Sequence, residues 1–162
     1  MPPPAPLSVR HDPRPADLDA VVRLHVEVYC RGLGFDGDFA GHVEVPLRRW
    51  AEGRTDRDRI WLVERAGELA GCVAVVRADE RTAQLRWFVV HPAERGRGVG
   101  RWLLGEAVAF ARQAGYAAMI LWTVNTLTTA AKLYTAAGFR LAEEVPGGWA
   151  EGMTEQRYEV RL

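Results

Sequence analysis

The sequence is poor in cysteine, and this shortage limits the classes of protein to which it can belong. Of 162 residues, two are cysteines, Cys30 and Cys72, and both lie in apolar segments without metal or redox spacing. A small secreted scaffold held by disulfides is therefore ruled out, and no metal is expected. The reduced state of these thiols is typical of a cytoplasmic protein.

Net charge and long apolar runs are also missing. Lysine plus arginine number 21, as do aspartate plus glutamate, so the formal net charge is zero and no field favours nucleic acid. No apolar run is long enough to span a bilayer, and residues 1–6 lack the charged region and apolar core of a signal peptide. We therefore expect a soluble cytoplasmic protein that binds neither nucleic acid nor membranes.

The chain length fits one domain after a short leader. The prolines of residues 1–6 favour an extended, disordered leader, and we assign residues 7–162 to one folded domain. The spacing of apolar residues predicts helices at 15–29, 39–50, 99–114 and 126–137, with Pro46 kinking or splitting the second. It predicts strands at 7–10, 60–65, 69–76, 82–90, 117–124, 139–145 and 157–161, with Gly71 at a bulge or a close approach.

One stretch, residues 87–102, organises the chain. A hydrophobic strand and a proline turn lead into Arg95-Gly96-Arg97-Gly98-Val99-Gly100-Arg101, where a helix begins. The first N–H groups of a helix have no intrahelical partners, and the helix dipole favours an anion there. Glycine lets the backbone approach a phosphate closely and tolerates positive φ. The stretch therefore predicts a phosphate-bearing ligand that the main chain binds.

Two common phosphate motifs do not fit this stretch. A P-loop needs Gly-Lys-Ser/Thr, but Gly100 is followed by Arg101 and Trp102. A dinucleotide fingerprint needs G-x-G-x-x-G after the first strand and an acid about twenty residues later, where Ile120 stands here. The remaining pattern is Arg/Gln-x-x-Gly-x-Gly/Ala, matched from Arg95 to Gly100.

This pattern resembles the acyl-CoA signature of the GNAT superfamily of N-acetyltransferases. Residues 130–139, AAKLYTAAGF, resemble that family's second signature, A-x-x-x-Y-x-x-x-G-F. The resemblance implies an α/β (α+β) fold with a mixed, mostly antiparallel sheet of about seven strands flanked by about four helices. Residues 29–145 also resemble the acetyltransferase half of bacterial MarR–GNAT fusion proteins, which suggests a version without the DNA-binding half.

The resemblance implies acetyl-CoA as co-substrate and assigns its contacts. The main chain of Phe88, Val89 and Val90 pairs with the pantetheine arm, and an N–H group near Val90 meets the thioester oxygen. The pyrophosphate is bound by the loop and helix start, that is by Arg95, Gly96, Arg97, Gly98, Val99, Gly100 and Arg101. Asn125 is expected to replace a CoA-binding asparagine that the family places seven residues before Tyr134, where Leu127 stands.

Tyr134 is the predicted catalytic residue. Family resemblance places it beside the CoA sulfur, where it assists departure of the thiolate. A phenol has a pKa near 10 and a thiol one near 8.5, so a hydrogen bond to the thiolate is favoured over full proton transfer. The alternative is a tyrosine packed in the core on the apolar face of its helix.

The acceptor site and the general base are less defined. Tyr29, Phe35, Trp87 and Trp149 are candidate acceptor contacts; Phe35 packing in its loop and Trp87 in the core are the alternatives. Asp36 is an acceptor or helix-capping candidate, and Trp122 is expected in the core. Many family members carry a glutamate on the strand before the loop, but residues 84–88 contain no acid. The base could be Glu27, Glu44, Glu80, His25 or a water chain.

The expected function is acetyl transfer to an amine of a small molecule or a protein. Because the strand acid is missing, a non-catalytic acyl-CoA-binding module is the alternative, and NAD or ATP binding is a remote third. A homodimer is left open.

Overall fold

The structure is a computed structural model that describes residues 1–162. Its helices are α1 (Pro15–His25), α2 (Phe39–Gly53), α3 (Val99–Gln113) and α4 (Thr128–Ala136), with a π-helix η1 (Val26–Arg31) and a 3₁₀ turn η2 (Pro92–Glu94). Its strands are β1 (Ser8–Arg10), β2 (Arg59–Arg65), β3 (Glu68–Arg77), β4 (Thr82–Val90), β5 (Ala118–Val124), β6 (Arg140–Pro146) and β7 (Thr154–Arg161). The expected element order and α/β class are confirmed.

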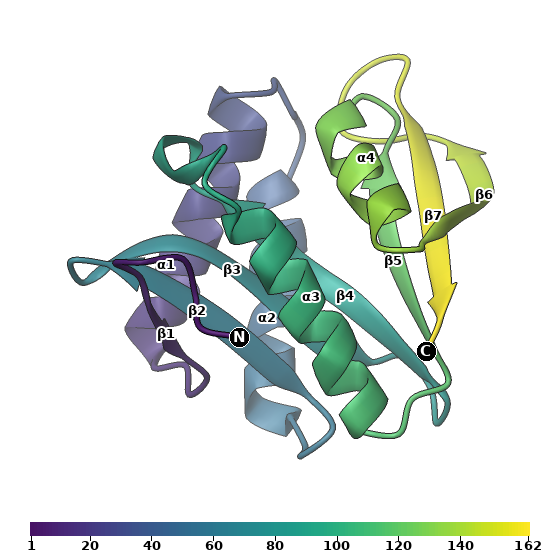
Figure 1. Ribbon diagram of the computed structural model, residues 1–162. Coiled ribbons are helices and arrows are strands. Elements are labelled where there is room, and N and C mark those ends of the chain that lie inside the picture. Colours follow the sequence, from purple (N-terminus) through teal and green to yellow (C-terminus); the bar gives the residue numbers. More distant parts are fainter.

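The strands form one mixed sheet. Their order is β1-β2-β3-β4-β5-β7-β6 in a seven-stranded sheet. Every neighbouring pair is antiparallel except β4 and β5, which run parallel. Figure 1 shows β4 and β5 close together at one end and diverging toward the other. The mostly antiparallel sheet is as expected.

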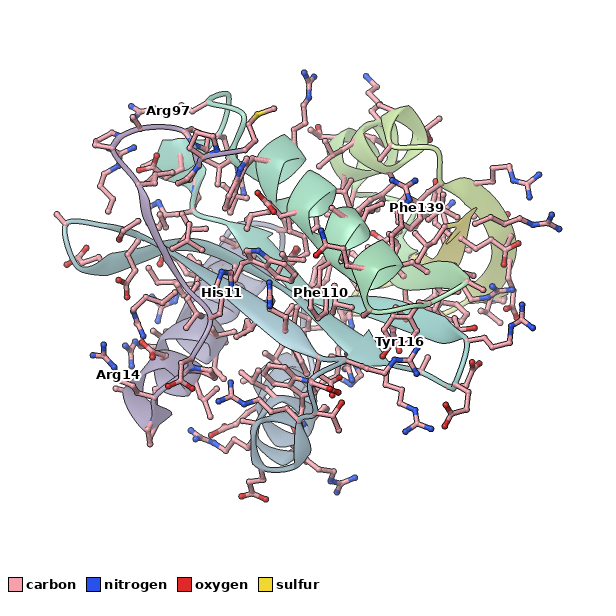
Figure 2. The ribbon with its side chains drawn as sticks, turned by 60° about the horizontal axis from the view of Figure 1, so that its bottom comes forward. His11, Arg14, Arg97, Phe110, Tyr116 and Phe139 are labelled. Atoms are coloured by element: carbon pink, nitrogen blue, oxygen red, sulfur yellow. The ribbon has the colours of Figure 1, made fainter.

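Helices cover both faces of the sheet. In Figure 1, α3 and α4 lie in front of the strands, and α1 and α2 lie behind them. The α3 side holds one apolar cluster that includes Phe110 and Phe139, which Figure 2 shows near α3 and α4. The other side holds a second cluster that includes Leu47 of α2 and Val21 of α1. The sheet is thus buried on both faces along β2, β3 and β4.

The first two helices differ from the prediction in detail. α1 stops at His25 as an α-helix, and the chain continues without a break as the wider η1. Single π-helical turns inside helices are frequent at functional sites. Pro46 neither splits nor ends α2, which runs through it from Phe39 to Gly53.

Two further sequence expectations can be compared with the structure. β7 begins at Thr154 rather than 157, because its first residues pair with Val124 of β5 and Pro146 of β6. The close approach expected at Gly71 is confirmed, since a Cβ there would lie 3.0 Å from the carbonyl oxygen of Val89.

The N-terminal residues lie against α3. The indole N–H of Trp102 donates to the carbonyl oxygen of Met1 at 3.1 Å. The disorder expected for residues 1–6 stays a prediction. None of the helices combines the length and the apolar composition needed to cross a membrane.

Candidate functional site

The site is built around an interruption in β4. β4 pairs with β5 only from Thr82 to Gln84. Two β4 residues, Trp87 and Phe88, then lie opposite Val73 of β3, and Trp87 has φ 47°. This is a β-bulge, which bends a strand and increases its twist. The β5-facing edge of β4 beyond Gln84 therefore has no strand partner, and such an edge can pair with an extended ligand.

The glycine-rich loop lies where β4 ends and α3 begins. Gly96 and Gly98 have φ of 75° and 82°, and Gly98 is the N-cap of α3. No main-chain acceptor of the protein takes the N–H groups of residues 96–101. A Cβ placed on Gly96 or Gly98 would meet nothing within 4 Å, so both residues border open space. These unpaired donors at a helix N-terminus fit a phosphate group.

An ion pair with a buried carboxylate lies next to this loop. Glu94 of η2 is 5% exposed, and its carboxylate accepts from the Arg65 guanidinium at 2.5 and 2.8 Å. Arg65 lowers the pKa of Glu94, so the carboxylate is charged at neutral pH. Glu94 is not recognisable from the sequence, because only the fold brings the end of β2 beside η2.

The three loop arginines lie at the surface. Arg95 and Arg101 are exposed and have no carboxylate partner, whereas Arg97 lies 3.7 Å from Glu94. Figure 2 shows Arg97 at one end of the molecule, far from Tyr116, which follows α3. The side chains of Arg95 and Arg101 are therefore free to contact a phosphate or the solvent, whereas Arg97 is close to Glu94.

Tyr134 lies beside the bulge. Its ring is buried against Phe88, Phe139 and Tyr158, with centroids 6.3, 6.0 and 5.9 Å away. Its hydroxyl has no partner in the protein, yet it is not among the fully enclosed unpaired polar atoms. Burial raises the pKa of Tyr134 well above its usual value, so the hydroxyl is protonated and free to donate.

Tyr29 reaches the same point from the opposite face. From η1, its hydroxyl donates to the carbonyl oxygen of Phe88 at 3.0 Å. Burial raises the pKa of Tyr29 to about 12. Tyr29 thus holds the bulge in place, and its hydroxyl is already occupied. The structure thus brings together three predicted site residues from both faces of the sheet: Tyr29, Phe88 and Tyr134.

The other aromatic candidates separate into buried and accessible residues. Phe35 is buried between Tyr29 and Phe39, at centroid distances of 5.3 and 5.4 Å. Trp87 is 7% exposed and packs on Trp50 at 5.6 Å. Both side chains are therefore packed inside the protein, which is the alternative to a role as acceptor contacts.

Trp149 and Trp122 behave differently from those two. Trp149 is half-buried on Phe39 and His42, at 5.3 and 4.8 Å, and lines a shallow groove on the outside of α2. Trp122 is 43% exposed, so its expected place in the core is wrong. No helix covers this face of β5 at Trp122, because the sheet has already divided there.

Two polar residues near the site make main-chain contacts within the fold. Asp36 does not cap α2; Asp38 does, accepting from the N–H of Gly41 at 3.0 Å, while the N–H of Asp36 donates to the carbonyl of Trp149. The side-chain oxygen of Asn125 accepts from the N–H of Thr154 at 2.9 Å, which joins the end of β5 to β7. Its contact with CoA stays a prediction.

The proposed bases lie in unequal positions. Glu80 lies in the turn before β4, whose residues from Thr82 to Val90 span roughly 26 Å at the strand rise, and it pairs with Arg77 and Arg57. Glu44 pairs with Arg48 on the outside of α2. Glu80 is therefore too far from the site to act as the base, and Glu44 is turned away from it.

The remaining named candidates lie nearer the site. His25 is 4% exposed, lies 2.8 Å from the Val21 carbonyl, and burial lowers its pKa to about 4. It is thus a neutral packed histidine. Glu27 is exposed and lies 3.9 Å from His91, which directly follows β4. Among the carboxylates proposed as the base, it is the one at the end of β4 that leads into the glycine loop. No group of three His, Cys, Asp or Glu side chains comes together that could hold a metal ion.

Comparison with known proteins agrees with this geometry. A profile of the acetyltransferase (GNAT) family matches residues 21–139. An uncharacterised N-acetyltransferase of Schizosaccharomyces pombe is 30% identical over 146 residues, 86% of each chain. The N-acetylaspartate synthetase of Danio rerio is 33% identical over 100 residues, 61% of this chain and 36% of that protein. A Salmonella typhimurium acetyltransferase solved with acetyl-CoA has a TM-score of 0.78 at 19% identity, covering 98% of this chain and 95% of that one.

Since the family profile covers most of the chain and agrees with the fold, the chain belongs to the acetyltransferase (GNAT) family. It is accordingly an N-acetyltransferase, with acetyl-CoA as its co-substrate. The residues present fit that co-substrate: free N–H groups for the pyrophosphate, and an open strand edge for the amide-containing arm.

Proposed function

We propose that the protein transfers the acetyl group of acetyl-CoA directly to an amine, and that Tyr134 assists departure of the thiolate. The observation that carries the proposal is a set of groups without protein partners along β4 and the loop that follows it. They are the N–H groups of residues 96–101, the open edge of β4, and the hydroxyl of Tyr134, whose ring lies 6.3 Å from that of Phe88.

The main chain supplies most of the cofactor binding in this proposal. The N–H groups of residues 96–101 bind the pyrophosphate, with Arg95, Arg97 and Arg101 adding charge. The main chain from Phe88 to Val90 pairs with the pantetheine arm as an added strand does. An N–H near Val90 stabilises the negative charge that develops on the thioester oxygen. Holding both reactants at this point can contribute several kcal/mol.

Tyr134 acts on the sulfur in this proposal. As the amine nitrogen bonds to the acetyl carbon, the carbon–sulfur bond breaks and its electron pair passes to sulfur. The Tyr134 hydroxyl donates a hydrogen bond to this developing thiolate. Because its pKa is raised by burial, it keeps its proton, and the thiolate is protonated later from solvent. The amine releases its proton to Glu27 or to water, since no carboxylate lies on residues 84–88.

Replacing Tyr134 by phenylalanine tests this role. Tyr134→Phe should lower kcat about 100-fold and change the acetyl-CoA dissociation constant less than about twofold, because the hydrogen bond acts mainly in the transition state. Thiol release with a panel of amines measures the rate, and calorimetry measures binding. The control is Tyr116→Phe, whose hydroxyl donates to the Arg57 carbonyl away from the site. An unchanged kcat in Tyr134→Phe would remove this residue from the mechanism.

A non-catalytic acyl-CoA-binding module is the second candidate. It is favoured by the missing carboxylate on the strand before the loop. The two functions are separated by the same assays: a module would bind acetyl-CoA and release no thiol with any amine. The cytoplasmic location expected from the sequence stays a proposal, and a homodimer is left open.

A further inference from the structure

Arg86 is a positive charge without a partner inside the sheet. It pairs in register with Ala74, whose side chain belongs to the apolar cluster under α1 and α2, so Arg86 faces the same side. The guanidinium lies over the Trp87 ring, 4.7 Å from its centroid. No carboxylate lies within ion-pair distance, and no hydrogen bond holds the side chain.

The other arginines show that this is unusual in the molecule. Eight arginines have a carboxylate within 4.0 Å, and every other arginine without such a partner is exposed, whereas Arg86 is half-buried. Burial lowers the pKa of Arg86, while carboxylate partners raise that of Arg10, Arg48, Arg65 and Arg157. A partly desolvated cation without a counter-charge costs stability. Such a charge is one that an anionic ligand would neutralise.

Arg86 lies at the point where the sheet divides. The last pair between β4 and β5 joins Gln84 to Ile120. The next residues on the same face are Arg86 and Trp122, one on each side of the division. Trp122 is 43% exposed, so this face is open to solvent there. Arg86 precedes Phe88 by two residues, which is roughly 7 Å along the strand.

Carboxylates on this face are engaged elsewhere or more distant. Arg157, opposite Trp122 on β7, is held by Glu143 and Glu159 at 3.1 and 3.0 Å. Glu155 lies opposite Val124, one step nearer the end of β5, and forms no ion pair. None of these carboxylates lies within ion-pair distance of Arg86.

We propose that Arg86 binds a carboxylate of the acceptor, so that the amine to be acetylated belongs to an amino acid or to a similar amine carrying a carboxylate close to its nitrogen. This proposal rests on the proposed function and names its substrate class. A guanidinium has the planar fork that matches a carboxylate with two parallel hydrogen bonds. With the carboxylate held at Arg86, the nearby amine points along β4 toward Phe88 and the thioester.

Matched amines test the substrate class. Thiol release is measured for L-amino acids and for their carboxamides, which differ by the carboxylate. We expect kcat/KM to be at least 100-fold higher for a preferred amino acid than for its carboxamide. Arg86→Gln should lower kcat/KM for the amino acid to about the value for its carboxamide, and Arg86→Lys should restore part of the difference. Equal rates for acids and carboxamides with wild-type enzyme would overturn the inference and leave acetyl transfer intact.

A matched control and a second readout separate this proposal from the proposed function. Arg59→Gln is the control, because Arg59 also lies over an aromatic ring, Phe110 at 4.5 Å, but is exposed on the α3 side. Succinate, which has carboxylates and no amine, is titrated by calorimetry into the CoA-saturated protein. Wild type and Arg59→Gln should bind it and Arg86→Gln should not, even if no amine releases thiol. Phosphate is titrated in the same way for comparison. If the wild-type protein binds phosphate but not succinate, or binds neither anion, the assignment of Arg86 to a carboxylate is overturned.

Discussion

The two faces of β4 carry two proposed sites of different construction. On the α3 face, the proposed binding groups are six consecutive unpaired N–H groups and an open strand edge, so recognition by the main chain is proposed there. On the α1/α2 face, the distinctive group is one side chain, Arg86, which lies over the buried ring of Trp87. A main-chain site depends on φ angles and glycines and tolerates many surrounding sequences. A side-chain site depends on one charge and can change its ligand by one substitution.

The largest effect on cofactor binding should come from filling the main-chain site. Gly98→Glu places bulk and a negative charge in the open space beside Gly98, where the pyrophosphate is proposed to bind. We expect acetyl-CoA affinity to fall at least 100-fold, about 3 kcal/mol, as measured by calorimetry. The control is Gly105→Glu, which adds the same group to an exposed position of α3 with open space around it. Equal affinity in the two variants would remove the glycine loop from the cofactor site.

The next prediction separates two tryptophans on the α1/α2 face. Trp87→Ala removes a buried side chain and should cost about 3–5 kcal/mol of the free energy of unfolding. Trp122→Ala removes an exposed side chain and should cost less than about 1 kcal/mol. Urea unfolding monitored by circular dichroism measures both values. Equal losses would mean that Trp122 is covered in solution and that this face of the sheet is closed.

The last prediction concerns the pH dependence that His25 gives to stability, on the same face. Its pKa is lowered to about 4 from 6.5 by burial, so the unfolded chain binds a proton at a higher pH than the folded one. Stability is therefore complete above pH 6.5 and is lost as the pH falls toward 4, by about 3 kcal/mol in total.

Replacing this histidine removes that pH dependence. His25→Phe keeps the aromatic contact with Tyr29 and removes the group that binds the proton. The free energy of unfolding of this variant should therefore fall less steeply between pH 6.5 and pH 4 than that of wild type. The exposed His42→Phe serves as the control. A slope like that of wild type would contradict the packed role, and a lost kcat in a folded His25→Phe would make His25 the base.

Local features of this chain were predictable from the sequence. The glycine loop, the helix that follows it and the order of the elements depend on neighbouring residues, and all are found as expected. The close approach of the Val89 backbone to Gly71 was also predictable, because a glycine inside an apolar strand indicates a close neighbour.

Features that depend on the division of the sheet were not predictable. The apolar run of β5 suggests a strand covered on both faces, yet its end leaves the helices and exposes Trp122. The early start of β7 depends on pairing with β5 and β6, which are distant in sequence. The sequence shows Arg86 only as one of several arginines in strands. Only the register shows that its side chain is on the α1/α2 face, where it has no counter-charge. Long-range pairing decides each of these positions.

The most direct test of the account is a crystal structure with CoA bound. We predict the pyrophosphate on the N–H groups of residues 96–101, the pantetheine arm along the open edge of β4, and the sulfur beside the Tyr134 hydroxyl. A pyrophosphate away from the glycine loop, or a sulfur on the far side of the sheet from Tyr134, would contradict it.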